Sequence, residues 1–225
     1  MNRRVQGLTL AAAHWETPYF RQRLSLNSSR QQIRQQIRLR RQQLSDSEQR
    51  LAAESLLSQL QSFQPFVDAQ RVGIYLANDG EIDPDPIIQW LWQQQRQVYL
   101  PLLHPFCKGH LLFLQYQHDT LLIRNRFGIP EPSLDVTQIS PLNELDIILC
   151  PLVAFDANGN RLGMGGGFYD RTLSRWQTNA NNKPLPVGLA HDCQHVDSLP
   201  HQHWDVPLPT IITPSKQWQW TIKSI

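Results

Sequence analysis

The sequence predicts an α/β fold: a three-layer sandwich with a largely parallel central sheet and helices on both faces. From residue 71 onward, apolar runs of strand length alternate with a helical pattern, which is typical of βαβ units. The run 145–155 is apolar enough to be a strand that is buried on both faces. Two later runs, 186–190 and 209–213, supply further strands. Because ligands of such sheets bind beyond the carboxyl ends of the strands, we expect the functional site at that edge.

The first 26 residues differ in composition from the remainder of the chain. They carry arginines at positions 3, 4, 21 and 23, one acidic residue and no sustained apolar period. A transit-type leader is also arginine-rich and acid-poor, but this segment has no clear amphipathic repeat, so we interpret 1–26 as a poorly ordered N-terminal extension. Residues 27–225 are long enough for one substantial core and are interpreted as a single domain.

Two helices are expected before the first strand. A helix-start signal at 27–29 precedes a helix in which Ile33, Ile37 and Leu44 share one face. Arginines without nearby acidic residues form an adjoining stripe, at positions 30, 34, 38 and 41. Such a stripe is usually a solvated face, although the lack of acids favours an anionic ligand. A capping box at 45–48 begins a second helix, which carries leucines at positions 51, 56, 57 and 60.

A βαβ unit follows these helices. A strand over 72–76 leads to Asp83 and Pro84, an N-cap and a first helical position, and the next helix contains residues 87–95. The strand at 98–103 completes the unit.

The middle of the chain has no helical pattern. The runs 110–116 and 121–126 are interpreted as an antiparallel pair, followed by a proline-rich loop that contains the sequence GIPEP. The central strand at 145–155 then leads into a loop rich in glycine.

That loop, RLGMGGGFYDR at 161–171, is the stretch around which the chain is organised. Four of the eleven glycines fall within five residues, at positions 163, 165, 166 and 167. Glycine tolerates φ > 0 and can bring bare backbone N–H groups against a ligand, which favours phosphate binding over a simple surface turn. The following residues read as a short helix whose N-terminus faces the loop. The spacing matches neither the dinucleotide fingerprint nor the P-loop.

Composition limits the class of protein further. A net charge of +2 is too small to indicate a nucleic-acid surface, and no apolar run approaches the ~20 residues of a membrane span. Three widely spaced cysteines suit reduced thiols in a cytosol. We therefore expect a cytoplasmic protein, in monomeric form, that binds neither nucleic acid nor a membrane.

The loop 191–205 contains four histidines and a cysteine, which are residue types that zinc accepts. Their spacing matches no standard zinc motif, so exposed polar histidines are the preferred interpretation.

The sequence resembles the 5-formyltetrahydrofolate cyclo-ligase family over nearly all of residues 30–220. The resemblance rests on four motifs in order: RQQIR at 30–34, YLANDGEID at 75–83, FDANGN with RLGMGGGFYDR at 155–171, and WDVPLPTIITPSK at 204–216. It implies an α/β sandwich that uses ATP and Mg²⁺ to close 5-formyltetrahydrofolate to 5,10-methenyltetrahydrofolate, with release of ADP and phosphate. A formamide oxygen is a poor leaving group, and the resemblance implies that it is phosphorylated before N10 attacks.

The resemblance also implies roles for particular residues. The catalytic residues would be Arg34, Arg161 and Tyr169. ATP would contact Arg30, Arg34, Arg161, Leu162, Gly163, Met164, Gly165, Gly166, Gly167, Phe168 and Tyr169. The folate substrate would contact Leu76, Glu81, Met164, Gly165, Gly166, Gly167 and Phe168, and the Mg²⁺ positions would be Asp170 and Asp205. Some relatives carry basic residues where this chain has Met164 and Gly166, so here backbone N–H groups, flanking arginines and Mg²⁺ would neutralise more of the phosphate charge.

An alternative of another class is a non-catalytic RNA- or phosphate-binding module that uses the arginine-rich helix and the glycine loop. It predicts binding with a steep salt dependence and no ATP turnover. The basic helix lacks interleaved stacking aromatics, which argues against this alternative.

Overall fold

The structure, a computed structural model, describes residues 29–174, 176 and 183–221. Within this part of the chain, eight strands form one sheet in the order β13-β12-β10-β7-β1-β2-β3-β6. Its strands are β1 (Arg71–Gly73), β2 (Gln97–Leu103), β3 (Leu111–Tyr116), β6 (Ile139–Ser140), β7 (Ile147–Pro151), β10 (Leu185–Leu189), β12 (Thr210–Ile212) and β13 (Gln217–Gln219). The five central strands run parallel, and antiparallel strands lie at both edges. The predicted α/β fold with a largely parallel sheet is confirmed.

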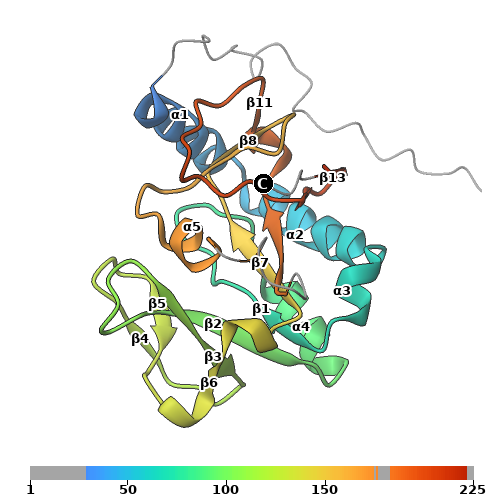
Figure 1. Cartoon of the computed structure of the whole chain (residues 1–225). Helices are drawn as coiled ribbons and strands as arrows, with labels where there is room; N and C mark the ends of the chain where they lie inside the picture. The colour runs from blue at the N-terminus through green and yellow to red at the C-terminus, as the bar shows by residue number, and fades with distance from the viewer. Residues whose placement is uncertain (1–28, 175, 177–182, 222–225) are drawn as a thin grey trace, which may run out of the picture.

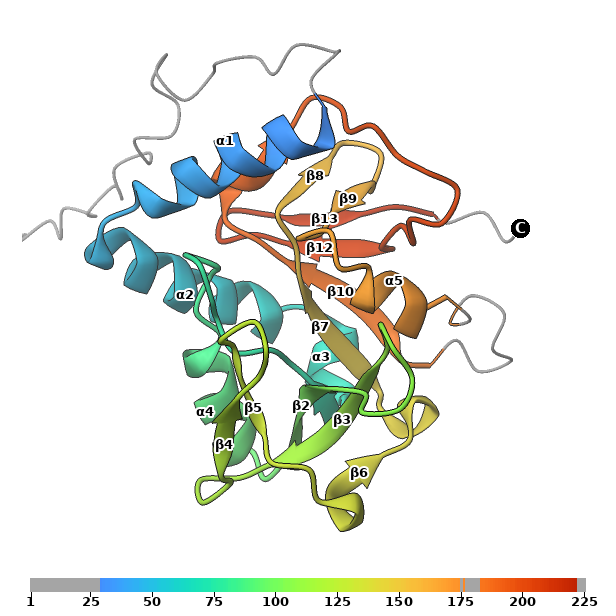
Figure 2. The same cartoon turned by 90° about the vertical axis from the view of Figure 1, so that its left-hand side faces the viewer.

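Helices α2 (Asp46–Gln61), α3 (Gln64–Asp68) and α4 (Asp85–Gln93) pack on one face of the sheet. Fully buried Leu56 and Leu60 of α2 meet strand residues such as Ile147 in one apolar core. On the other face, the short helix α5 (Phe168–Thr172) and the turn after it, with Leu173, cover Ile148 and Cys150. Helices therefore lie on both faces, although the α5 side is only thinly covered (Figures 1 and 2).

Helix α1 (Arg30–Gln42) lies across the end of the sheet, where it contacts β8 (Ala154–Asp156) and a 3-10 turn, η5 (Asp192–Gln194) (Figure 2). Strand β8 belongs to a second small sheet with β9 (Arg161–Leu162) and β11 (His195–Val196). Buried Ile33 and Ile37 pack onto this small sheet. Helix α1 is thereby placed above the carboxyl ends of the parallel strands.

The helix starts follow from local sequence signals. Ser29 accepts a hydrogen bond from the Gln32 N–H at 3.3 Å, while the Gln32 side chain accepts one from the Ser29 N–H at 2.7 Å, which completes a capping box. Ser45 and Glu48 form the equivalent box for α2. The two helices begin where the sequence predicts, but Leu51 is 60% exposed and lies outside the core.

Helix α4 begins one residue later than expected. Pro84 is its N-cap, and the Asp83 carboxylate accepts a hydrogen bond from the Asp85 N–H at 3.0 Å. The unit of β1, α4 and β2 is the predicted βαβ unit, with β1 and β2 parallel.

Two predictions for the middle of the chain are wrong. Strand β3 does not pair with the run at 121–126; it pairs with β2 and β6, while β4 (Leu122–Arg124) pairs with β5 (Pro130–Pro132) inside the expected proline-rich loop. The predicted strand at 145–155 divides into β7 and β8, which belong to different sheets. Pro151 has no N–H to donate to the ladder, so the chain leaves the large sheet there.

None of the helices in the described ranges is long and apolar enough to cross a membrane. The predicted extension at 1–26 lies outside the described residues. Cys107, Cys150 and Cys193 are all free thiols.

Candidate active site

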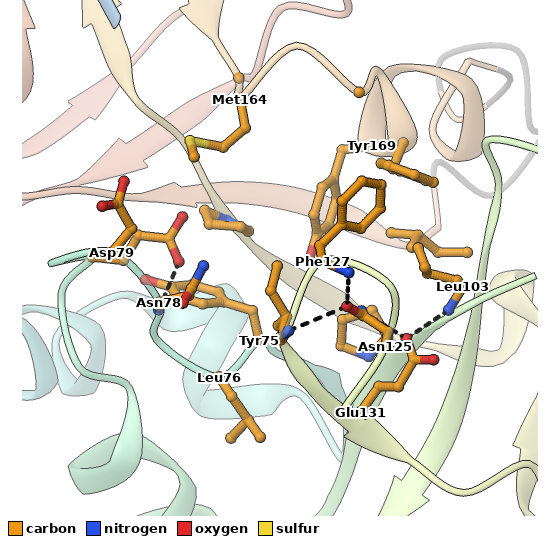
Figure 3. Close-up of a pocket in the computed structure, with 18 of the residues that line it drawn as sticks. Tyr75, Leu76, Asn78, Asp79, Leu103, Asn125, Phe127, Glu131, Met164 and Tyr169 are labelled. Carbon is orange, nitrogen blue, oxygen red and sulfur yellow. Dashed lines mark hydrogen bonds between the residues drawn. The ribbon is translucent and has the colours of Figure 1, made fainter. Parts of the chain in front are cut away.

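A cavity of about 490 Å³ lies at the carboxyl ends of β1, β2 and β7 (Figure 3). One wall is the segment 75–81 that follows β1, and the opposite wall is formed by residues 125–131 around the β4–β5 hairpin. The glycine loop and α5 close a third side. The predicted site residues among the cavity lining are Leu76, Glu81, Arg161, Gly163, Met164, Gly166, Gly167, Phe168, Tyr169 and Asp170.

The glycine loop has a conformation that depends on glycine. Gly165 has a φ of 105° and Gly167 a φ of 64°, in the left-handed region that side chains disfavour. Gly167 is the N-cap of α5, as the predicted loop-to-helix transition requires. An added Cβ at Gly166 would lie 2.6 Å from the Phe168 ring, so this position also has no room for a side chain.

Arginines hold the carbonyl oxygens of this loop. Arg34 Nε donates to the Gly163 oxygen at 2.8 Å, and Arg171 Nη2 donates to the Gly166 oxygen. The backbone N–H groups of residues 163–167 donate no hydrogen bond to any described residue. The loop therefore presents free N–H donors, which is the arrangement that binds phosphate oxygens.

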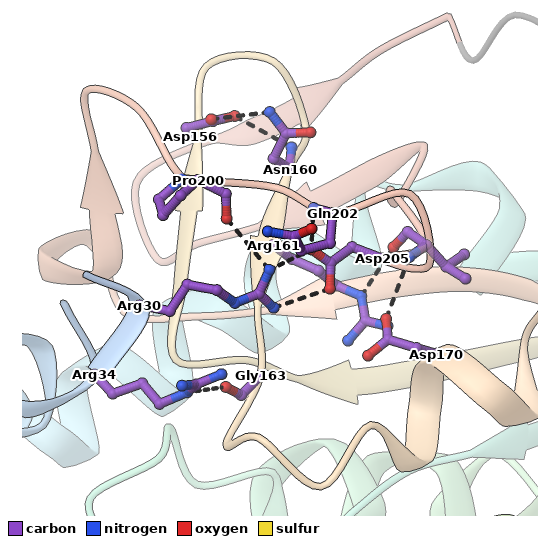
Figure 4. A network of polar contacts seen from close by, with 11 residues as sticks. Arg30, Arg34, Asp156, Asn160, Arg161, Gly163, Asp170, Pro200, Gln202 and Asp205 are labelled. Atoms are coloured by element: carbon purple, nitrogen blue, oxygen red, sulfur yellow. Dashed lines mark hydrogen bonds and ion pairs between the residues drawn. The ribbon is translucent and has the colours of Figure 1, made fainter. Parts of the chain in front are cut away.

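Two ion pairs join α1, the glycine loop and the loop before β12 (Figure 4). Arg30 forms a two-point contact with Asp205, at 2.5 and 2.9 Å. Arg161 donates to Asp170 at 2.5 Å and to the Val206 carbonyl oxygen at 3.1 Å. Burial raises the pKa of Asp205, but the hydrogen bond and charge of Arg30 outweigh it, so the net pKa is below the usual range. Asp205 is consequently ionised at neutral pH.

Arg34 differs from Arg30 because it has no carboxylate partner among the residues that the structure describes. Burial and the neighbouring Arg30 charge lower its pKa, which marks a cation in a locally positive environment. Only its Nε is used, by Gly163, and an added Cβ at Gly165 would lie 3.6 Å from its guanidinium carbon. The rest of the guanidinium remains available to an anion beside the loop.

Asp170 and Asp205 belong to one charge cluster. Asp170 contributes to the raised pKa of Arg30, and Arg161 contributes to the lowered pKa of Asp205. Within the described ranges, no three side chains of His, Cys, Asp or Glu gather into a metal cage. Mg²⁺ on a nucleotide needs only one or two carboxylates in addition to phosphate oxygens and water. Asp170 has one oxygen, Oδ2, without a hydrogen bond to a described residue, so it fits that donor set directly. Both oxygens of Asp205 accept from Arg30, so Asp205 fits the set as a ligand through water.

Glu81 and Tyr169 are two predicted site residues in the cavity whose pKa values burial raises strongly. Burial raises the pKa of the Glu81 carboxyl to about 7, although its Oε2 accepts a hydrogen bond from the Asn78 N–H at 3.1 Å. Burial raises the pKa of Tyr169 well above its usual value, and its hydroxyl has no hydrogen-bond partner in the described structure. Tyr169 therefore stays protonated and offers a free donor inside the site.

Several residues of the cavity were missed by the sequence analysis. Glu131 is 8% exposed, and its Oε2 accepts hydrogen bonds from the Leu103 N–H at 3.1 Å and from Asn125 Nδ2 at 3.0 Å. Phe127 packs edge-on against Phe168, with ring centroids 5.9 Å apart. The only available signal was the acidic residue within GIPEP, which had been interpreted as part of a loop.

Five of the predicted site residues lie outside the cavity lining: Arg30, Arg34, Leu162, Gly165 and Asp205. All except Leu162 belong to the ion-pair network, support the glycine loop or form part of it. Leu162 is 1% exposed and packs in the core below the loop. The predicted exposure of the histidine loop is only partly correct, because His191 is 2% exposed.

The chain is an α/β protein in which a glycine loop with N–H donors borders an apolar-walled cavity at the carboxyl ends of parallel strands. This arrangement suits a protein that holds a phosphate group next to an organic ligand. A family model described as the 5-formyltetrahydrofolate cyclo-ligase family matches residues 26–214, and the chain belongs to this family.

Individual relatives agree with this assignment. The chain is 50% identical to the 5-formyltetrahydrofolate cyclo-ligase of Escherichia coli K12 over 184 residues, which are 82% of this chain and 100% of that protein. It is 52% identical to the Haemophilus influenzae protein of the same name over 183 residues, 81% of this chain and 96% of the relative.

Solved structures resemble most of the chain. The NMR structure of Aquifex aeolicus 5,10-methenyltetrahydrofolate synthetase has a TM-score of 0.71 and 29% identity, and the match covers 84% of this chain and 92% of that one. The match to the Mycoplasma pneumoniae 5,10-methenyltetrahydrofolate synthetase has 24% identity and a TM-score of 0.65, and it covers 83% of this chain and 99% of that one. At this identity the match supports the fold. These comparisons do not support the alternative of an RNA-binding module.

Proposed function

We propose that this chain catalyses the ATP-dependent closure of 5-formyltetrahydrofolate to 5,10-methenyltetrahydrofolate, with release of ADP and phosphate. Membership of the family supports the reaction. The structural observation that carries the proposal is the glycine loop, whose unpaired N–H groups border a cavity large enough for an organic ligand. Phosphate groups and a folate can thus be held side by side, as a transfer between them requires.

The nucleotide side of the site consists of α1 and the glycine loop. When bound, ATP supplies the phosphoryl group that turns the formyl oxygen into a leaving group. The free N–H donors of 163–167 and the uncommitted guanidinium nitrogens of Arg34 would hold phosphate oxygens. Arg30 and Arg161 lie on either side of these phosphate-binding groups. Both are already paired with carboxylates, so they stabilise the neighbouring loops and also contribute positive charge.

Mg²⁺ would be held by Asp170 and Asp205, with the remaining ligands from phosphate and water. The arginine partners keep both carboxylates oriented toward the same region (Figure 4). Asp170 uses only its Oδ1 in hydrogen bonds to described residues, so its Oδ2 is open to a cation.

The folate side of the site is the cavity itself. Leu76, Met164 and Phe168 supply apolar contacts, and Glu81 would accept hydrogen bonds from the pterin amino and ring N–H groups. The Tyr169 hydroxyl, protonated and unpaired, would donate to an oxygen on the transferred group. Arg34, Arg161 and Tyr169 are therefore the proposed catalytic residues.

The reaction can be measured directly, because the methenyl product absorbs in the near ultraviolet. Mixing the full-length chain with Mg-ATP and 5-formyltetrahydrofolate should give an absorbance rise that requires ATP. A chelator should abolish the rise, and added Mg²⁺ should restore it. No ATP-dependent rise with folded protein would disprove the proposed reaction.

A further inference from the structure

Arg41 is unlike the other arginines of α1. Its residue is fully buried, whereas the side chains of Arg30 and Arg38 are 24% and 46% exposed. The sequence places Arg41 on the basic stripe, but its side chain points into the protein, beneath the segment that follows β1. Arg41 is therefore not accessible to an anionic ligand at the surface of α1, although its place on the basic stripe predicts such access.

The contacts of Arg41 are concentrated on one residue of that segment. Its Nη2 donates to the backbone oxygen of Asp79 at 2.9 Å and to the Asp79 carboxylate at 3.2 Å. Its Nε and Nη1 are buried and have no partner among the described residues. A buried guanidinium with unused donors is costly to the fold, so its presence calls for a reason other than stability.

The segment held by Arg41 is a strained turn that carries Glu81. Asp79 and Gly80 both have positive φ, 53° and 72°, and a Cβ on Gly80 would lie 3.4 Å from the Arg41 Cβ. The Glu81 N–H donates to the Asn78 oxygen at 3.1 Å, and the Glu81 carboxylate accepts from the Asn78 N–H (Figure 3 shows Asn78 and Asp79 beside the cavity). Fixing Asp79 from below therefore fixes the direction of the Glu81 side chain.

The charges named for Glu81 come from helix α1 and from the 78–81 turn itself. Arg41 of α1 favours the ionised carboxylate, whereas Asp79 on the same turn opposes it. Arg38, also of α1, pairs with Asp79 on its outer side.

Three buried titratable groups near the turn are uncharged at pH 7. Tyr75 and Tyr169 have pKa values well above the usual tyrosine value, mainly because they are buried. Burial and the Arg41 charge lower the pKa of His191 to about 4. Arg41 is thus a buried cation that lowers the pKa of Glu81, against the larger opposite effect of burial.

We propose that Arg41 is a positioning residue for folate binding: it fixes the 78–81 turn, and with it the Glu81 side chain, from inside the protein. The proposal rests on the proposed contact between Glu81 and the folate. Arg41 itself touches neither ligand; it acts through Asp79 and through its charge.

The test measures the titration of Glu81 in the full-length chain without any substrate. The protein is labelled with ¹³C-glutamate, and the Glu81 carboxyl resonance is identified by its loss in Glu81→Gln. In Arg41→Gln the midpoint of Glu81 should rise by roughly one pH unit or more, because a nearby opposite charge is lost. In Asp79→Asn the midpoint should fall, because a like charge is lost, and asparagine tolerates the positive φ at this position. Arg38→Gln, which removes the exposed cation paired with the same Asp79, should shift the midpoint by less than half as much as Arg41→Gln.

An unchanged midpoint in folded Arg41→Gln would overturn the proposal, and so would a rise in Asp79→Asn. If Arg41→Gln does not fold, the Asp79→Asn titration decides the electrostatic claim. The positioning claim is tested by measuring 5-formyltetrahydrofolate affinity as a function of pH. In Asp79→Asn, the pH at which the affinity changes should shift together with the midpoint of the Glu81 titration. A moved midpoint with an unmoved affinity profile would overturn it. Failure of the proposed reaction would instead show as wild-type protein that forms no methenyl product.

Discussion

At the scale of single residues, the site depends on side chains whose charges are set by burial. Glu81 has a partly buried carboxyl with a pKa of about 7, so near neutral pH its protonated and ionised forms are both populated. Tyr169, by contrast, stays protonated. The cavity thus holds one acceptor that titrates and one donor that does not.

Glu81→Gln should weaken the binding of 5-formyltetrahydrofolate about tenfold or more, because substrate N–H donors lose a carboxylate partner and an unpaired buried donor costs about 1–3 kcal/mol. ATP affinity should be unchanged, since the nucleotide side of the site does not include Glu81. Both affinities can be measured by isothermal titration of the wild type and the variant. Equal folate affinity in the two proteins would show that the carboxylate does not contact the substrate.

The same carboxylate gives folate binding a pH dependence with a defined sign. Binding that needs the ionised form is fully present above the folded-state pKa of Glu81 and is lost as the pH falls through about 7. The Glu81→Gln variant should lack this transition.

Among helices and strands, the predictions that the structure confirms are those that depend on local sequence signals. The capping boxes at Ser29 and Ser45 involve residues three apart, so they are visible in the sequence and appear in the structure. The choice of strand partners is not visible in the same way: β3 pairs with β2 and β6, whereas β4 pairs with β5. The run at 121–126 has the composition of a strand, but nothing in its residues specifies that its partner is a proline-flanked segment at Pro130–Pro132.

The same distinction applies to the site. The glycine loop was predicted because its chemistry is contained within eleven consecutive residues. Glu131 and Asn125 were missed because their role arises only when the β4–β5 hairpin folds over the cavity. Arg41 was interpreted as part of a basic face, since burial of one arginine among four cannot be read from a helical period.

The glycine loop supports a prediction about backbone conformation. Gly165→Ala should reduce nucleotide affinity strongly, because a φ of 105° is strained for alanine and the loop N–H groups would be reoriented. Gly163→Ala is the matched comparison, because its φ is not positive and an added Cβ meets nothing within 4 Å. It should cost clearly less affinity. Nucleotide binding measured by fluorescence titration distinguishes them, and equal losses would mean that side-chain bulk, not φ, limits the loop.

At the scale of the whole molecule, the site is assembled from parts that are distant in the sequence. Arg30 reaches Asp205 across 175 residues, and Arg34 reaches Gly163 across 129. Helix α1 therefore makes two kinds of contact: its apolar face packs onto the small sheet, and its arginines reach the loops that form the proposed nucleotide side of the site. Packing of its apolar face sets the position of α1, and the charges of Arg30 and Arg34 determine its proposed role.

These two contributions can be separated by changes near the N-terminus. The capping box of α1 is complete with Ser29 and Gln32, so the start of the helix does not need residues 1–26. Deleting 1–26 should leave ATP-dependent cyclisation within about twofold of the full chain. The combined change Arg30→Ala and Arg34→Ala in the full-length chain should instead cost several kcal/mol of ATP binding and transition-state stabilisation, because charge-assisted hydrogen bonds to phosphate are lost. Arg38→Ala removes one charge from the exposed side of the same helix and should cost much less. Steady-state rates and ATP affinity measured on all three proteins, with circular dichroism to verify folding, test the prediction. Normal ATP affinity in a folded double variant would show that these arginines serve the ion-pair network alone.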